Sequence, residues 1–246
     1  MGFFFQNSTI GDISTGGFLA LIIPAIIAIN GGKIDIRMRW YSIRYRNQMV
    51  RISAAYLFRI KIDGQYLLIM SSRFPHYQPV GGVFKVSPKG QSFLANLGAQ
   101  DDDLIPIDQK SKADLRIRIR GASVSRFYDW FDSRSGREDS PWREFHEELL
   151  SNSILPSSTF PYIFHEYQGR SVAKIRYSPY ASSQEIMIFD IYELLPTPEQ
   201  EEAIRSIITS DRNEFSWFTS DEIKRRGVLP GMPNVTPIAE HTQEIL

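Results

Sequence analysis

The 246-residue sequence contains no cysteine. Disulfide bonds, thiolate zinc sites and cysteine nucleophiles are therefore excluded, and cysteine usage carries no information about the compartment. The chain also lacks an excess of charge, since 28 basic residues balance 28 acidic ones. We therefore expect no specific DNA binding, because there is no overall positive charge to attract a polyanion. The length is sufficient for one sizeable domain with a hydrophobic core and a small appendage.

Lysine and arginine are absent before Lys33, and this part of the chain holds its most apolar stretch. From Phe18 to Ile29 every residue is apolar except Pro24. These 12 residues are fewer than the about 20 that a membrane-spanning helix needs, but the stretch 10–30 has 21 residues and one charge. A signal peptide is disfavoured because no basic residue precedes the stretch. We expect a short transmembrane helix over about residues 10–30; the alternative is a buried hairpin or a partner-binding segment.

Six basic residues, from Lys33 to Arg51, follow this apolar stretch. Basic residues next to a membrane segment mark its cytoplasmic side. We therefore expect residues 1–47 to comprise a single-pass membrane segment and a basic juxtamembrane linker. Residues 48–246 are expected to form a cytoplasmic domain.

The remainder of the chain alternates between strand patterns and helix patterns. Asp63-Gly64 is a hairpin-turn signal between two apolar strands, and Thr197-Pro198 is a typical helix start. Residues 88–115 are expected to be a long surface loop. The expected strands lie at 50–60, 66–70, 78–86, 115–120, 172–177, 184–194 and 215–218, and the expected helices at 123–132, 197–208 and 219–227. This order predicts an α/β or α+β domain with a mixed sheet and helices on both faces.

The segment 141–150 reads PWREFHEELL and concentrates three glutamates in five positions. Ser140 followed by Pro141 predicts a helix start. At 100° per residue, the apolar residues and His146 fall on one side of the helix, so we expect His146 to be packed. The other side carries the glutamates, which are Glu144, Glu147 and Glu148.

Two interpretations of these glutamates remain open from the residues alone. The first is a solvated face of an amphipathic helix, which is what such charge runs usually are. The second is a metal site, because carboxylate oxygens that converge from one face suit Mg²⁺ or Mn²⁺.

The spelling Arg143-Glu144-Phe145-x-Glu147-Glu148 resembles the centre of the Nudix box. Two further segments support this resemblance: QPVGG at 78–82 is similar to the Pro-Gly-Gly element that opens the box, and EFSWFTSDEIKRRG at 214–227 is similar to the closing strand and helix of Nudix domains. Three elements in the family's order indicate a NUDIX αβα sandwich.

The box departs from the family pattern in three places. An insertion at about 87–139 separates its two halves. Ser135 occupies the position of the first glutamate of the box, for which Glu138 is a candidate replacement, and Leu150 occupies the position of the closing glycine. With this split box, and with DLRIRIRGASVSRFYDWFDSR at 114–134, the chain resembles the SMODS-associated NUDIX domains, which are found beside bacterial cyclic-oligonucleotide synthases of CBASS antiviral operons.

The resemblance implies a function and a cellular location. It implies a membrane-anchored effector or sensor in the bacterial inner membrane, whose NUDIX domain binds a nucleotide second messenger from a partner synthase. It also implies that ligand binding drives homo-oligomerisation. The alternative that it implies is a Mg²⁺-dependent Nudix hydrolase that cleaves a nucleoside diphosphate linked to a second group.

The resemblance also assigns roles to residues by their match to the box. Glu144, Glu147 and Glu148 would hold Mg²⁺ or Mn²⁺, with Glu144 and Arg143 as the catalytic pair. The ligand would also contact Gly81 and Gly82. On physical grounds, the arginine face of the strand LRIRIR could pair with phosphate oxygens, and the aromatic rings of the following helix could stack a base. The arginines have a second interpretation as charges that guard an exposed strand edge. These further candidates are Arg116, Arg118, Arg120, Tyr128 and Trp130.

Overall fold

A computed structural model describes residues 36–102, 111–210, 212–228 and 236–246. The expected transmembrane helix at 10–30 lies outside these ranges. Within them, no helix combines the length and the apolar composition needed to cross a bilayer.

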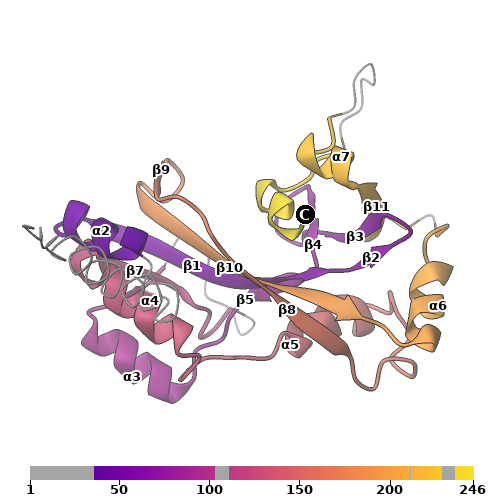
Figure 1. The fold of residues 1–246 in the computed structure, drawn as a ribbon, viewed down its shortest axis with the longest axis horizontal. Helices are drawn as coiled ribbons and strands as arrows, with labels where there is room; N and C mark the ends of the chain where they lie inside the picture. Colours follow the sequence, from indigo (N-terminus) through magenta and orange to yellow (C-terminus); the bar gives the residue numbers. More distant parts are fainter. Residues whose placement is uncertain (1–35, 103–110, 211, 229–235) are drawn as a thin grey trace, which may run out of the picture.

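The centre of the fold is a mixed sheet built on two long strands (Figure 1). Strand β1 (Met49–Arg59) runs parallel to β10 (Ser183–Leu195) over ten residue pairs. All other pairings of this sheet are antiparallel among the residues described. The sheet follows the order β6-β7-β1-β10-β8, with β5 paired to β1 and β9 paired to β10. The bounds of these strands are β5 (Gly81–Val83), β6 (Gln100–Asp101), β7 (Arg116–Arg120), β8 (Phe164–Val172) and β9 (Arg176–Ser178). The predicted mixed sheet is therefore confirmed.

A smaller antiparallel sheet forms around β3 (Gln65–Met70). β2 (Lys61–Ile62) and β11 (Phe215–Thr219) flank β3, and β4 (Tyr77–Pro79) also pairs with it. The β2–β3 turn consists of Asp63 and Gly64, whose φ angles of 50° and 82° are both positive. Such a turn matches the twist of a two-residue hairpin, which explains why the Asp-Gly signal predicted it.

The helices are short, and two of them begin as the sequence predicts. Thr197 starts α6 (Pro198–Ser206) and Thr219 starts α7 (Ser220–Lys224), each with a reciprocal capping box. The expected loop at 88–115 is wrong in part, because its first residues form a helix that Ser87 caps. The remaining helical segments are α2 (Ile36–Arg44), α3 (Pro88–Asn96), η1 (Gly121–Ser123), α4 (Val124–Asp132), α5 (Trp142–Phe145), η2 (His146–Leu150) and η3 (Glu240–Ile245).

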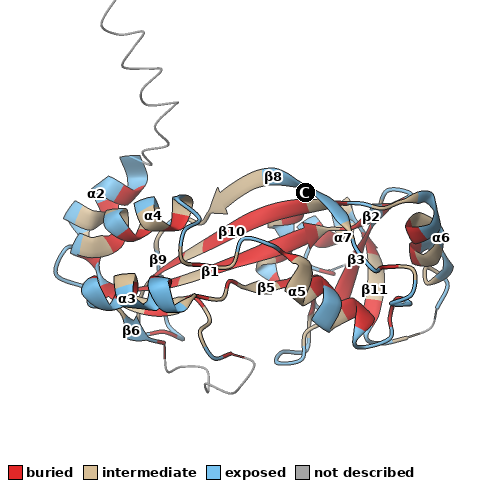
Figure 2. Cartoon of the chain, turned by 90° about the horizontal axis from the view of Figure 1, so that it is seen from below, coloured by how far each residue is buried: buried red, intermediate tan, exposed pale blue. Residues whose placement is uncertain are grey.

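Alternate residues of β1 contribute to two hydrophobic cores on opposite faces of the sheet. β1 and β10 are buried along most of their length (Figure 2). Tyr56 and Phe58 belong to the larger core, which also contains residues of α4, α5 and η2. Ala55 and Leu57 belong to the smaller core, together with residues of α7 and η3. Helices therefore cover both faces, as predicted. The side on which Tyr56 lies is called the Tyr56 face below.

The region 87–139, where we expected an insertion, is part of the sheet. It contributes α3, β6, β7 and α4, and β7 pairs with β1 from Met49 to Ser53. Strand β8 was missed by the sequence analysis, and the expected strand at 172–177 is interrupted between β8 and β9.

Candidate functional site

The glutamate segment lies against the glycine pair of β5. The backbone N–H of Gly81 donates a hydrogen bond of 2.8 Å to Oε2 of Glu148. A Cβ atom at Gly82 would overlap the carboxylate of Glu144, and one at Gly81 would overlap the carbonyl oxygen of Tyr56. Only glycines therefore allow the β5 backbone to approach both β1 and the carboxylates this closely. Two parts of the split box thus meet in space.

The guanidinium group of Arg143 contacts three glutamates of this site and the backbone of β5. It donates to both carboxylate oxygens of Glu138, at 3.0 and 3.1 Å, and to the carbonyl oxygen of Val83 at 3.0 Å. It also donates to Oε1 of Glu144 at 2.5 Å and lies 3.6 Å from the carboxylate of Glu147. Glu138, the suggested replacement for the first glutamate of the box, therefore holds the arginine in place through a bidentate pair.

Tyr56 adds a phenol beneath the same cluster. Its hydroxyl oxygen accepts a hydrogen bond of 3.3 Å from the backbone N–H of Glu144. Burial, followed by the charge of Glu138, raises the pKa of Tyr56. The phenol is therefore neutral at physiological pH and lies on the buried side of the site.

The carboxylates of this cluster outnumber its cations. Burial raises the pKa of Glu148 well above its usual range, and the charge of Glu144 raises it further. The pKa of Glu144 is also raised, chiefly by burial, although Arg143 opposes this shift. Glu138 and Glu147 add two more carboxylates, with Arg143 as the cation that contacts the cluster. Such an excess of partly buried negative charge favours a bound cation.

The donor chemistry of this cluster fits Mg²⁺ or Mn²⁺, although its geometry does not form a complete cage. Across the described parts of the chain, no group of three or more His, Asp or Glu side chains is arranged to hold a metal ion. The side chain of Glu147 is 44% exposed and turns toward Arg143. Mg²⁺ commonly uses one or two carboxylates and fills its shell with water and substrate phosphate. Glu144 and Glu148 provide such a pair.

The helix that carries the glutamates departs from the prediction. Its regular α-helical part ends at Phe145, and His146–Leu150 form a π turn in which the N–H of Ser151 donates to the carbonyl of His146 at 2.8 Å. A wider turn changes the angle between residues, so a wheel drawn at 100° per residue misplaces them. The prediction that His146 is packed is wrong, because its side chain is exposed. π turns inside helices often occur at functional sites.

The arginines of β7 do not join the glutamates. In the register of β7 with β1, Arg118 lies opposite Arg51 and Arg116 lies opposite Ser53. Arg51 and Ser53 alternate along β1 with the residues on the Tyr56 face. Cross-strand partners point to the same side of a sheet, so the arginines point away from the Tyr56 face. Arg116 pairs with Asp114 at 3.1 Å and Arg118 with Asp102 at 3.4 Å. Arg120 is exposed. β7 is also not an outer edge, since β6 pairs with it.

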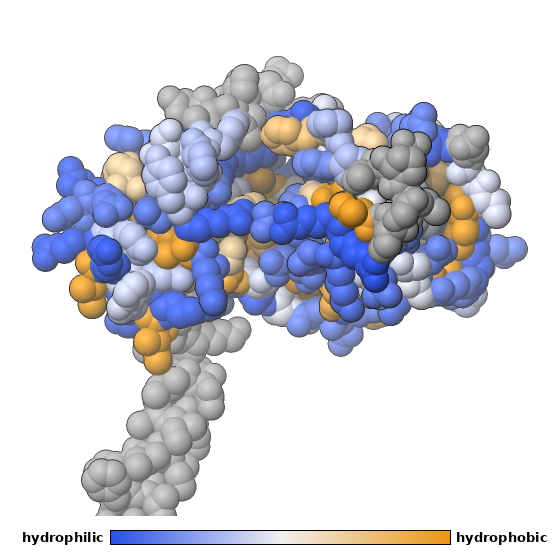
Figure 3. Space-filling view, turned by 90° about the horizontal axis from the view of Figure 1, so that it is seen from above, coloured by the Kyte–Doolittle hydropathy of each residue, from blue (hydrophilic) through white to orange (hydrophobic). Residues whose placement is uncertain are grey.

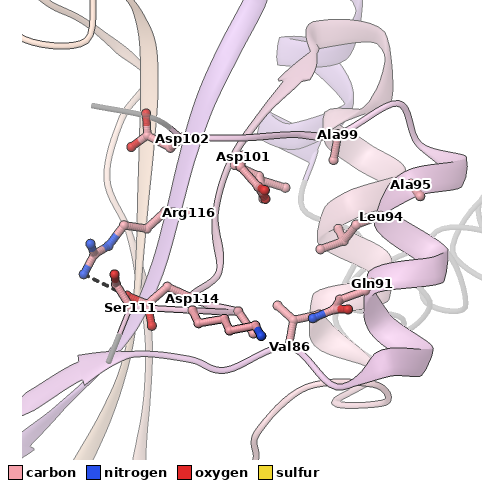
Figure 4. Close-up of a pocket in the computed structure, with 13 residues that line it drawn as sticks. Val86, Gln91, Leu94, Ala95, Ala99, Asp101, Asp102, Ser111, Asp114 and Arg116 are labelled. Atoms are coloured by element: carbon pink, nitrogen blue, oxygen red, sulfur yellow. Dashed lines mark ion pairs between the residues drawn. The ribbon is translucent and has the colours of Figure 1, made fainter. Parts of the chain in front are cut away.

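Arg116 instead borders a separate cavity of about 660 Å³ between α3 and β7 (Figure 4). Asp101, Asp114 and Gln91 line it together with apolar residues such as Leu94. In the close-up, Arg116 reaches toward Asp114. The cavity does not include the glutamates.

The aromatic residues proposed to stack a base are engaged in packing. Trp130 stacks on Phe93, with 5.3 Å between ring centroids and 14° between ring planes. Arg170 lies over the ring of Tyr128 at 5.8 Å. Base stacking on these rings would require both contacts to change.

A buried ion cluster on the Tyr56 face was missed by the sequence analysis. Asp190, which is 0% exposed, pairs in register with Tyr56. Its carboxylate accepts hydrogen bonds from Arg170 at 2.6 and 3.1 Å and from Arg137 at 3.4 Å. Arg137 also lies over the ring of Phe131 at 4.0 Å. One signal was available, because an aspartate inside the apolar strand IMIFDIYEL needs a buried cation.

Comparison with known proteins agrees with this geometry. A family model described as the SMODS-associated NUDIX domain matches residues 49–246. Neither a curated protein nor a solved structure matches the chain. The matched range covers most of the 246 residues, and the mixed sheet fits an α+β NUDIX-like fold. The chain belongs to the SMODS-associated NUDIX domain family.

Proposed function

We propose that this chain binds a phosphate-bearing nucleotide through a divalent cation held by Glu144 and Glu148. The observation that carries the proposal is the packing of these two carboxylates against Gly81 and Gly82. The raised pKa values of both glutamates mean that the folded protein holds carboxyl groups whose charge is poorly compensated. A cation would compensate this charge, and phosphate oxygens would complete its coordination shell.

The metal that fits these donors is Mg²⁺ or Mn²⁺, since NUDIX domains are generally dependent on divalent metals. Glu144 and Glu148 would bind it directly, and Glu147 would approach it after leaving Arg143. When bound, the metal supplies positive charge that attracts phosphate. The backbone of Gly81 and Gly82 leaves room beside the carboxylates, because these residues have no side chains.

The ligand that we propose is a cyclic oligonucleotide from a partner synthase. The family description links the domain to SMODS, the nucleotide synthases that the sequence resemblance also implies. In this account the chain is the effector of a CBASS antiviral system, and ligand binding drives its homo-oligomerisation. The apolar stretch 10–30 would anchor it in the bacterial inner membrane with the NUDIX domain in the cytoplasm.

The second candidate function is a Mg²⁺-dependent Nudix hydrolase. The specific observation in its favour is that Arg143 is held by Glu138 and Val83 and donates to Glu144. Glu144 would then accept a proton from the attacking water, and Arg143 would orient its carboxylate. The substrate would be a nucleoside diphosphate linked to a second group.

One experiment separates the two functions. The purified full-length chain is titrated with cyclic di- and trinucleotides and with nucleoside diphosphate derivatives, in Mg²⁺ and in EDTA, and every ligand is recovered and analysed for cleavage. Mg²⁺-dependent binding of an intact cyclic nucleotide supports the effector. Turnover that is lost in Glu147→Gln supports the hydrolase. The absence of both contradicts the proposal.

A matched control and a membrane test complete this design. Arg120→Ala changes an exposed residue of β7, whose arginines point away from the Tyr56 face, and is expected to leave Mg²⁺-dependent binding unchanged.

Carbonate extraction of bacterial membranes tests whether the stretch 10–30 anchors the chain. Release of the full-length chain into the supernatant would contradict membrane insertion.

A further inference from the structure

Helix α2 is fixed to the domain by one of its sides. Met38 and Tyr41 are buried on this side. The hydroxyl of Ser42 accepts a hydrogen bond of 2.8 Å from the N–H of Ser125 in α4, and the hydroxyl of Tyr41 accepts one of 3.3 Å from the N–H of Ile175. α2 is therefore held in one orientation on the domain.

The opposite side of α2 carries large apolar residues that stay more than half exposed in the described structure. Ile36 is 62% exposed, Trp40 is 53% exposed and Ile43 is 74% exposed. Their spacing of i, i+4 and i+7 places them in one row along the helix. We call these three residues the outer stripe. Hydrophobic patches stand out among hydrophilic residues at this end of the molecule in the surface view (Figure 3, lower left).

Arginines border the outer stripe on both sides. At 100° per residue, Arg39 lies on one side of the stripe and Arg44 on the other, and both are exposed. Arg46 lies two residues beyond the end of the helix and is also exposed. An apolar row flanked by guanidinium groups is the pattern of a helix that lies in the interface of an anionic bilayer.

The position of α2 in the chain favours the same partner. Six residues separate α2 from the apolar run that ends at Ile29. A second copy of the chain is a poorer partner, because joining two outer stripes would bring the arginines of both copies together. A tryptophan in the row is also typical of a membrane interface.

We propose that the outer stripe of α2 docks on an anionic lipid surface and sets the orientation of the NUDIX domain against it. The proposal rests on the membrane attachment proposed above. Ile36, Trp40 and Ile43 enter the boundary between headgroups and acyl chains, while Arg39 and Arg44 contact lipid phosphates. Because α2 is hydrogen-bonded to α4, the membrane contact is transmitted directly to the domain.

The absence of cysteine makes a site-specific test simple. Ile43→Cys in the full-length chain receives the only thiol, which is labelled with an environment-sensitive fluorophore. Glu202→Cys is the matched control, because Glu202 is exposed on α6, at the other end of the molecule from α2 (Figure 1). Each labelled protein is reconstituted in vesicles of phosphatidylcholine with or without phosphatidylglycerol. Flotation reports attachment, and quenching by brominated lipids reports burial of the label.

We expect the label at residue 43 to shift to the blue and to be quenched in vesicles with phosphatidylglycerol, and the label at residue 202 to remain in water. Replacing Arg39 and Arg44 by alanine should reduce the shift at residue 43. A chain that floats while both labels remain in water overturns the docking proposal and leaves the attachment intact. A shift at residue 43 without lipid also overturns it, since another segment or copy then covers the stripe. A chain that does not float contradicts the attachment itself.

Discussion

The carboxylate of Glu148 accepts a 2.8 Å hydrogen bond from the backbone N–H of Gly81, which precedes it by 67 residues. This contact joins the π turn to β5 across the split of the Nudix box. It also keeps a partly buried carboxylate next to Glu144. Burial raises the pKa of both glutamates, and the charge of Glu144 raises that of Glu148 further. The site is therefore strained electrostatically in a way that a cation would relieve.

Glu148→Gln is expected to stabilise the protein and to remove its response to Mg²⁺. The amide oxygen of glutamine still accepts from Gly81, but the desolvated charge is gone. Because the folded-state pKa of Glu148 is raised above 4.5, ionisation at neutral pH lowers the free energy of unfolding of the native protein. We expect the variant to gain about 0.5–2 kcal/mol in urea denaturation at pH 7 without divalent cations.

Glu147→Gln is the matched control for this measurement. Its side chain is substantially exposed, so its replacement should change the free energy of unfolding by less than about 0.5 kcal/mol. A Glu148→Gln variant that is less stable than the native protein would contradict the electrostatic account of the site.

Gly82→Ala is expected to weaken divalent-cation binding by about tenfold to a hundredfold, the range seen when groups that orient ligands are changed. The added Cβ would overlap the carboxylate of Glu144 and displace it. Gly64→Ala is the control, because it adds a Cβ in open space at a positive φ of 82° and costs about 1–2 kcal/mol through the backbone alone. Isothermal titration with Mn²⁺ measures the affinity of each variant, which should fall in Gly82→Ala and stay unchanged in Gly64→Ala. Equal Mn²⁺ affinities in both variants would contradict the close contact.

Asp190→Ala is expected to lower the free energy of unfolding by about 3–5 kcal/mol, because Arg137 loses its carboxylate partner and Arg170 keeps only Asp132. Glu240→Ala, which removes an exposed partner of Arg176, should cost less than about 1 kcal/mol. Both values come from urea denaturation. If Asp190→Ala does not fold, Asp190→Asn, which keeps the shape of the side chain, provides the measurement.

His241 is expected to make the protein acid-sensitive. It stacks on Phe189, and burial, followed by the charge of His76, lowers its pKa from 6.5 to about 4. Above pH 6.5 both the folded and the unfolded states keep it neutral. Between pH 6.5 and 4 only the unfolded state gains the proton, so the free energy of unfolding falls as the pH falls, by at most about 3 kcal/mol.

His241→Phe tests this prediction, because it keeps a ring on Phe189 and removes the titration. Thermal denaturation from pH 8 to pH 4 should show a smaller loss of stability in the variant than in the native protein. His146→Gln, at an exposed position, serves as the control. Identical pH profiles for His241→Phe and the native protein would refute a role for this histidine.

Local patterns predicted much of the fold. The alternation of LRIRIR specified β7, and the threonine caps specified α6 and α7. Strand β8 was missed because most of its residues are exposed, so it lacks the alternation that a half-buried strand shows. The position of His146 was missed because nothing in PWREFHEELL signals a π turn.

The contacts of the site depended on the family pattern more than on periodicity. The match to the box brought the glycines at 81–82 together with the glutamates. The arginines of β7 could not be placed in the same way, because alternation shows that they share a face but not which face of the sheet that is. The register between β7 and β1 decides which face the arginines take, and this register depends on residues far apart in the sequence.

The most direct test of the central claim is a titration of the full-length chain with Mn²⁺, in which the electron paramagnetic resonance signal of free Mn²⁺ reports binding. We predict saturable binding by the native protein and by Arg120→Ala. In the double variant Glu144→Gln with Glu148→Gln, we predict that this binding is lost. Equal binding by the native protein and the double variant would contradict the assignment of these glutamates as the metal site.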